Sequence, residues 1–236
     1  TMDLVQAPSR SVLSEEQLAS MHRSKVEIRE FFAEQIAYRR RHPGKDLISA
    51  LVRAEEDHQT LTELEILSLL SIMVVGGAET PSHLIGTTLW ELFDNPDAMA
   101  VVKENPDRIS DALEETLRHQ SPVHFIFQTA AKDVEMRGIT IPEGSTVFSF
   151  ISSANRDERV FENPDVFDIN RNSRNDHLAF ARGPHYCIGD NLGRLMCSTA
   201  VRLALARMPD LHPVEPQIEW MPSFWIRGPK ALKVAY

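Results

Sequence analysis

The stretch HLAFARGPHYCIG, residues 177–189, decides how the rest of this sequence is interpreted, and we call it the cysteine loop. It places Cys187 between two glycines, Gly183 and Gly189, with His185 two residues before the cysteine. A free cysteine usually lies in a hydrophobic core, where it behaves as a small apolar side chain. A cysteine among glycines and polar residues therefore needs another explanation.

Cys187 has three plausible uses: a nucleophile with His185 as its base, an inert core residue, or a thiolate ligand to a metal or haem. The third use fits the neighbours best. Gly183 and Gly189 let the backbone approach a flat group closely. A helix expected just after Cys187 points its positive end at the sulfur, which stabilises the thiolate. The second cysteine, Cys197, lies inside that helix and is expected to be core.

A second unusual stretch is GGAETP, residues 76–81, in the middle of a long apolar helical pattern. Two glycines cost about 1 kcal/mol each inside a helix, and an interior proline costs about 3 kcal/mol. Pro81 has no N–H, so the carbonyl of Gly77 loses its helical partner beside Glu79 and Thr80. This stretch predicts either an opened helix that accepts water or a small ligand, or a simple kink.

The composition of the 236-residue chain fits one soluble globular domain, with a net charge of −9, 42% hydrophobic and 25% charged residues. An acidic chain argues against a nucleic-acid partner. Two cysteines without a CxxC pair exclude a disulfide scaffold and a structural zinc site, and indicate a reducing cytoplasm. The most apolar run, 66–75, is too short to cross a bilayer, so we expect no membrane association.

Hydrophobic periodicity predicts a mainly helical chain with small sheets. Capping boxes at Ser14 with Gln17 and at Thr62 with Glu65 open the first and the central helix. The apolar residues around the central helix predict that it is buried. Predicted helices cover residues 15–42, 47–54, 62–93, 96–104, 106–120 and 190–208, and predicted strands cover 134–136, 139–141 and 146–148.

Four motifs, in their order along the chain, resemble those of the cytochrome P450 family of haem-thiolate monooxygenases, of the soluble bacterial type. The cysteine loop matches the signature Phe-x-x-Gly-x-His-x-Cys-x-Gly, and residues 76–80 match the oxygen-activating helix. The third motif, Glu-x-x-Arg, comprises Glu115 and Arg118. The fourth motif supplies Arg171, which in the family completes a buried charge cluster with these two residues. The resemblance implies the C-terminal part of that fold, as a single domain over residues 1–236 without the N-terminal part.

The resemblance also implies a role for each matching residue. Cys187 becomes the axial ligand of the iron in haem b, and Thr80 with Glu79 supplies protons during oxygen activation. Glu115, Arg118 and Arg171 are structural. The residues implied to contact the haem, with Arg182 and His185 at its carboxylates, are Gly77, Phe180, Arg182, Gly183, His185, Cys187 and Gly189.

The implied activity is monooxygenation of a small organic, natural-product-like substrate in the cytoplasm. Electrons come from NAD(P)H through a ferredoxin or similar donor, which docks beside the cysteine loop at Arg182, Arg194 and Arg202. The alternative is a truncated, non-catalytic relative that acts as a partner or scaffold, with weak haem binding or none.

Three departures from the family pattern bear on that choice: Gln128 replaces a common arginine, Ala181 replaces a glycine, and Pro81 follows Thr80. Gln128 weakens haem anchoring, Ala181 is expected to be harmless, and Pro81 alters the oxygen pocket. Without the N-terminal part, apolar residues such as Ile72 and Val75 are expected to be uncovered. The chain would then self-associate or lose haem easily.

Overall fold

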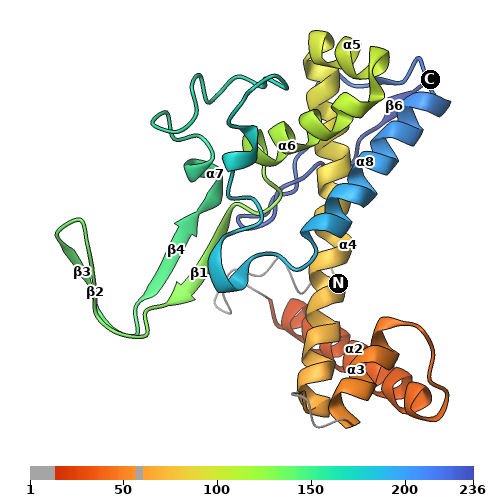
Figure 1. Ribbon diagram of the computed structural model, residues 1–236, viewed down its shortest axis with the longest axis vertical. Helices are drawn as coiled ribbons and strands as arrows, with labels where there is room; N and C mark the ends of the chain where they lie inside the picture. Colours follow the sequence, from red (N-terminus) through yellow and green to blue (C-terminus); the bar gives the residue numbers. More distant parts are fainter. Residues whose placement is uncertain (1–13, 57–60) are drawn as a thin grey trace. The chain divides into compact units, whose positions relative to one another are not determined.

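The computed structural model describes residues 14–56 and 61–236, which divide into two compact units, Thr1–Glu79 and Thr80–Tyr236 (Figure 1). Helices dominate both units, and the second unit also carries three small two-stranded sheets. The predicted fold class, mainly α with small sheets, is confirmed. Each unit is described by itself below.

The first unit is built on α2 (Glu15–Arg41), α3 (Leu47–Glu56) and the N-terminal half of α4 (Glu63–Asp94). The predicted capping box opens α2, because Gln17 N donates to Ser14 Oγ at 3.1 Å and Ser14 N donates to Gln17 Oε1 at 2.9 Å. His42 ends the helix as expected. The buried core of this unit comprises Phe32, Ile36, Val52, Ile66, Leu67 and Leu70.

Helix α4 begins at the second predicted capping box, where Thr62 N donates to Glu65 Oε2 at 2.7 Å and Glu65 N donates to Thr62 Oγ1 at 3.3 Å. The helix then continues through Pro81 to Asp94. Its expected burial is only partly correct: Ile66, Leu67 and Leu70 are buried, but Ile72 is 66% exposed. An apolar pattern predicts what a helix can bury, and this chain alone does not cover every face of α4.

Among the described residues, α4 is also the one helix long and apolar enough to cross a membrane by length and composition. The expectation that no segment reaches that length is therefore wrong, because it considered residues 66–75 alone. Length and composition do not separate a membrane span from the core helix of a soluble protein. On this criterion α4 is weak evidence for a membrane.

The helices of the second unit follow the C-terminal half of α4. They are α5 (Pro96–Glu104), the 3₁₀ turn η1 (Pro106–Arg108), α6 (Ile109–His119) and α8 (Asp190–Arg207). The Asn105 side chain caps η1 by accepting from Asp107 N, as expected at an Asn-Pro step. Asn95 does not cap α5; its amide instead donates to the carbonyl of Glu91 at 2.8 Å.

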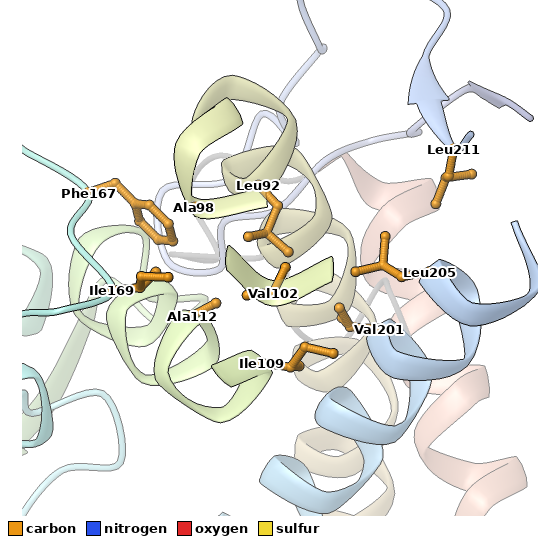
Figure 2. Packing of buried hydrophobic residues seen from close by; sticks show 10 residues of the cluster. All are labelled: Leu92, Ala98, Val102, Ile109, Ala112, Phe167, Ile169, Val201, Leu205 and Leu211. Atoms are coloured by element: carbon orange, nitrogen blue, oxygen red, sulfur yellow. The ribbon is translucent and has the colours of Figure 1, made fainter. Parts of the chain in front are cut away.

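Apolar residues from α4, α5, α6 and α8 meet in the main core of this unit (Figure 2). Leu92 of α4, Val102 of α5 and Val201 of α8 are almost fully buried there. Two further members, Phe167 and Ile169, come from the long connection before the cysteine loop. This core therefore anchors both α8 and the chain that leads into the loop.

The sheets are all antiparallel pairs: β1 (Phe125–Thr129) with β4 (Thr146–Phe150), β2 (Val134–Met136) with β3 (Ile139–Ile141), and β5 (His212–Pro213) with β6 (Val234–Ala235). The strands predicted at 134–136, 139–141 and 146–148 are confirmed. Strand β1 had no prediction, although it supplies the partner of β4 in register Phe125 to Phe150. Three short turns complete the unit: α7 (Ile151–Ala154), η2 (Arg174–Asp176) and η3 (Gly183–His185).

We predict that Gly228→Ala destabilises the second unit by about 1–3 kcal/mol, because overpacking a filled site displaces its neighbours. A Cβ at this buried glycine would lie 2.1 Å from Nδ1 of His83. The matched control is Gly193→Ala in α8, where a Cβ meets nothing within 4 Å. Alanine there should stabilise the helix by about 0.5–1 kcal/mol. Denaturant unfolding measures both, and equal midpoints for the two variants would contradict the prediction.

Candidate functional site

The cysteine loop carries Cys187 on an exposed turn directly before α8. Its backbone folds back on itself: Cys187 N donates to the carbonyl of Phe180 at 3.0 Å, and Tyr186 N donates to that of Gly183 at 3.0 Å. Gly183 has φ +80° and Ala181 has φ +60°. The sulfur therefore lies at the N-terminal end of α8, where the helix dipole stabilises an anion.

Ala181 occupies its left-handed conformation without being a glycine. A residue with a Cβ is strained there, by the order of 1 kcal/mol. The substitution that we expected to be harmless thus keeps the turn, at some cost in backbone strain.

The other predicted contact residues of the loop differ in their exposure. Arg182, Gly183 and His185 are exposed, whereas Phe180 is half-buried. A Cβ added to Gly189 would lie 3.9 Å from Cys187 Sγ. The loop thus presents the thiol and two basic side chains on an accessible surface.

The structure brings Glu115, Arg118 and Arg171 together in a buried ion cluster. Arg118 donates to the Glu115 carboxylate through Nη2 at 2.7 Å and through Nε at 2.9 Å, and Arg171 Nε adds a bond of 3.2 Å. Asp168 N donates to the same carboxylate at 3.0 Å. Breaking a buried pair of this kind costs about 3–5 kcal/mol, because it leaves a charge without its partner.

Asn155 connects this cluster to the start of the cysteine loop. Its carbonyl accepts from Arg118 Nη1 at 3.0 Å, and its side-chain Oδ1 accepts from Leu178 N at 2.7 Å. Asn155 is fully buried, so both bonds are shielded from water. Sequence analysis gave no role to Asn155, because its partners Arg118 and Leu178 lie far along the chain.

A second cluster of charged residues is centred on Glu114, which lies next to Glu115 on α6. Glu114 of α6 accepts bonds from His177, at the start of the loop, and from Arg194 of α8. Burial would raise the pKa of the Glu114 carboxyl, but the hydrogen bonds from His177 and Arg194 outweigh burial and lower that pKa to about 2. Sequence analysis missed Glu114 and His177, since their contact spans 63 positions of the chain.

Gly77, Glu79 and Thr80 follow one another along α4. Glu79 is buried and Thr80 is half-buried, while a Cβ at Gly77 would meet nothing within 4 Å. The helix leaves open space beside Gly77, as a close approach by a flat group requires. Gly77 and Glu79 belong to the first unit, and Thr80 opens the second.

Cys197 is fully buried between α4, α6 and α8, where it packs with Leu84, Leu113 and Leu117. Its thiol lies 3.6 Å from the carbonyl of Pro81, and burial raises its pKa to about 11. A protonated thiol in a core is a poor ligand and a poor nucleophile. Cys197 therefore has the core position that we predicted.

The arginines expected to attract an electron donor are not equivalent. Arg194 is engaged with Glu114 and Asp190, and Arg202 pairs with Asp107 at 3.0 Å. Arg182 is exposed and takes part in none of the ion pairs found in the described part of the chain. Arg194 thus has structural partners within the chain, and the docking of an electron donor at Arg182, Arg194 and Arg202 stays a prediction.

The donor chemistry of the loop fits haem. Within residues 14–56 and 61–236, no group of three His, Cys, Asp or Glu side chains could hold a metal ion. A single exposed thiolate fits an iron whose other ligands come from a porphyrin, since haem iron is held in this way by cysteine. The exposed basic side chains of Arg182 and His185 suit the carboxylates of such a group.

Comparison with known proteins gives the family. The sequence model of the family described as Cytochrome P450 matches residues 12–209. The "Biotin biosynthesis cytochrome P450" of Bacillus subtilis is 38% identical over 211 residues, which cover 89% of this chain and 53% of the relative. The "Cytochrome P450 monooxygenase PikC" of Streptomyces venezuelae is 37% identical over 215 residues, 89% of this chain and 51% of the relative.

A solved structure agrees with these matches. The crystal structure of P450BioI in complex with hexadec-9Z-enoic acid ligated acyl carrier protein has a TM-score of 0.89 at 36% sequence identity, over 95% of this chain and 57% of that one. The chain belongs to the cytochrome P450 family. It spans about half the length of the curated relatives it matches.

We predict that a thiol-alkylating reagent at pH 8 modifies Cys187 and spares Cys197 in the folded chain. Cys187 is exposed, whereas Cys197 is fully buried and has a pKa of about 11, so it stays protonated until the pH approaches that value. Only the thiolate reacts. Mass spectrometry of the digested protein locates the adduct. Equal labelling of both cysteines before unfolding would contradict the structure.

Proposed function

We propose that this chain forms the thiolate-bearing part of a bacterial cytochrome P450 monooxygenase and binds haem b through Cys187. The observation that carries the proposal is an exposed thiol on a turn tied to a buried charge cluster. A thiol in a flexible loop would be oxidised or would miss its ligand geometry, whereas this turn is fixed by hydrogen bonds on both sides. The family membership supports the same function.

The residues that would hold the haem are those of the loop and one glycine of α4. Cys187 would bind the iron through its sulfur, Phe180 and the glycines Gly77, Gly183 and Gly189 would allow close contact with the haem, and Arg182 and His185 would bind its carboxylates. When bound, the haem supplies oxygen activation, and a cysteine ligand favours O–O cleavage. Gln128, which is exposed on β1, offers an uncharged amide where many members have an arginine.

Glu79 and Thr80 would handle protons on α4. A hydroxyl beside a carboxyl can accept a proton on one side and donate one on the other. Pro81 prevents one backbone hydrogen bond to the carbonyl of Gly77, which leaves that oxygen to accept from water. Thr80 and the carbonyl of Gly77, three residues apart, would share one side of the helix, and Glu79 would supply a carboxyl next to them.

The substrate would be a small organic molecule of the natural-product kind, in keeping with one relative that is named for biotin biosynthesis. Electrons would come from NAD(P)H through a ferredoxin or similar donor, with Arg182 as a contact on the loop surface. We place the protein in the cytoplasm. We propose neither a nucleic-acid nor a membrane partner. The net charge of −9 disfavours binding to an anionic polymer such as nucleic acid.

Large apolar side chains remain exposed on the β1–β4 sheet and its surroundings, among them Phe127, Phe148, Phe150 and Phe224. On α4, Ile72 is exposed and Val75 is half-buried. Contiguous apolar surface of this kind favours association. The chain by itself would self-associate through these surfaces or bind haem weakly.

The test of this function is the visible spectrum of the haem-loaded chain, reduced and exposed to carbon monoxide. Cys187→Ala should abolish the thiolate-type spectrum, because it removes the axial ligand. Cys197→Ala is the matched control and should leave the spectrum unchanged, since Cys197 is core. A parent chain that takes up no haem would instead favour the non-catalytic partner or scaffold, and loss of the spectrum in Cys197→Ala alone would reverse the assignment.

Thr80→Ala should lower the product formed per electron pair by about tenfold or more in an active preparation, because general-acid groups contribute at least that much. Ser68→Ala on the same helix is the control, since that hydroxyl is exposed and donates to the carbonyl of Leu64. Oxidation of the electron donor and product yield are measured together. Unchanged coupling in Thr80→Ala would refute its proton-handling role.

A further inference from the structure

Glu114 lies next to Glu115 on α6, but its carboxylate reaches a different part of the chain. Arg194 binds it in a two-pronged manner, with Nε at 2.6 Å from Oε1 and Nη2 at 3.1 Å from Oε2. His177 Nε2 lies 3.0 Å from Oε2. The Glu114 side chain is 13% exposed and that of His177 is 3% exposed, so the bonds are largely protected from water. We call these three residues the Glu114 clamp.

The protonation of His177 follows from its two partners. Its Nδ1 accepts from the backbone N–H of Ala179 at 3.2 Å, which requires a lone pair on that nitrogen. Nε2 therefore carries the proton and donates to Glu114. The ring is fixed at both nitrogens, and one of these bonds reaches directly into the backbone of the cysteine loop.

Arg194 connects the clamp to the other side of Cys187. Its guanidinium carbon lies 4.4 Å from the centroid of the Phe180 ring, and its Nη1 donates to Asp190 Oδ2 at 2.8 Å. Phe180 is the residue whose carbonyl accepts the N–H of Cys187. Glu114 therefore holds the segments before and after the cysteine at the same time.

The clamp is distinct from the buried cluster around Glu115. That cluster reaches the cysteine loop through Asn155 and the N–H of Leu178. In the clamp, Glu114 instead binds His177 of the loop and Arg194 of α8, and Arg194 lies over the ring of Phe180. The lowered pKa of Glu114 keeps its carboxylate ionised at every pH where the protein would work. The clamp is a permanent electrostatic contact between α6, the loop and α8.

We propose that Glu114, acting through His177 and Arg194, is a positioning residue that fixes the direction in which the loop presents the Cys187 sulfur. This inference rests on the proposed function, since a fixed thiolate matters only if it binds iron. Its energetic basis is the strength of hydrogen bonds to charged groups, of which Glu114 receives three. A neutral amide at residue 114 would lose the charge and, with it, most of the hold on both segments.

The decisive variant is Glu114→Gln, compared with Asp111→Asn as a matched control. Asp111 lies on the same helix and also binds two arginines, Arg108 and Arg174, the latter at 2.6 Å. Within residues 14–56 and 61–236, the Asp111 side chain forms hydrogen bonds and ion pairs with these two arginines and with no residue of the cysteine loop, and it is 20% exposed. Each variant thus removes one half-buried carboxylate from α6, but only Glu114→Gln weakens a contact with the cysteine loop.

Two readouts are taken on the full chain. In the haem-free chain, hydrogen exchange of the segment 178–187 should accelerate about tenfold in Glu114→Gln, because charge-assisted bonds that hold it are lost. In the haem-loaded chain, a large share of the reduced, carbon monoxide-treated protein should lose its thiolate-type spectrum. Asp111→Asn should stay within about twofold of the parent in exchange and keep the spectrum.

His177 supplies a second pair of variants if Glu114→Gln fails to fold. His177→Gln retains an N–H donor for Glu114 and should preserve the thiolate-type spectrum, whereas His177→Ala removes the donor and should reduce it. A difference between these two variants at equal thermal stability supports positioning. Equal spectra for both would overturn it.

Failure of the inference and failure of the proposed function are distinguishable. If the parent chain takes up no haem while Glu114→Gln still accelerates exchange in the segment 178–187, the proposed haem function is refuted, but the role of Glu114 in holding the loop is supported. If the parent shows a thiolate-type spectrum and Glu114→Gln shows the same spectrum and exchange as Asp111→Asn, the positioning role is refuted.

Discussion

The carboxylate of Glu115 is the group on which the second unit depends, because it joins helix α6 to the distant connection around residues 168–171 at one buried point. It accepts from Arg118 on its own helix, from Arg171, and from the backbone of Asp168. Removing a carboxylate and two guanidinium groups from water costs several kcal/mol for each charge. That cost is offset only when the geometry is complete, so the connection between residues 155 and 171 must adopt one conformation. The core residues Phe167 and Ile169 are then placed against α5 and α6.

The adjacent residue, Glu114, connects the same helix to the cysteine loop. Successive residues of a helix point about 100° apart, so Glu115 and Glu114 face different neighbours. One binds the long connection and the other binds the cysteine loop and α8. Helix α6 therefore relates the structural cluster to the position of Cys187 without contacting that cysteine itself. The i,i+3 pair of Glu115 with Arg118, which would mean little on a surface helix, gains its importance from zero exposure.

Features with a local signal were predictable from the sequence. Ser14 with Gln17 and Thr62 with Glu65 mark helix starts because the capping partners are three residues apart, and the hairpin of β2 and β3 is marked by Arg137 and Gly138, both at positive φ. Strand β1 was missed because its partner β4 gives it a strand conformation that FIFQT does not specify by alternation. Glu114 and His177 were missed for the same physical reason: their contact spans 63 positions, and no local pattern encodes it.

Helix α4 shows the limit of the periodicity argument most clearly. Apolar residues around the whole helix predicted burial on every side, yet Ile66 and Leu70 are buried while Ile72 is exposed. The pattern reports the environment for which the helix is suited, and the chain spans about half the length of its relatives. Exposed apolar area has a free-energy cost of about 25 cal/mol per Å², which any surface that covers α4 would recover. An exposed apolar face on α4 therefore favours association with any surface that covers it.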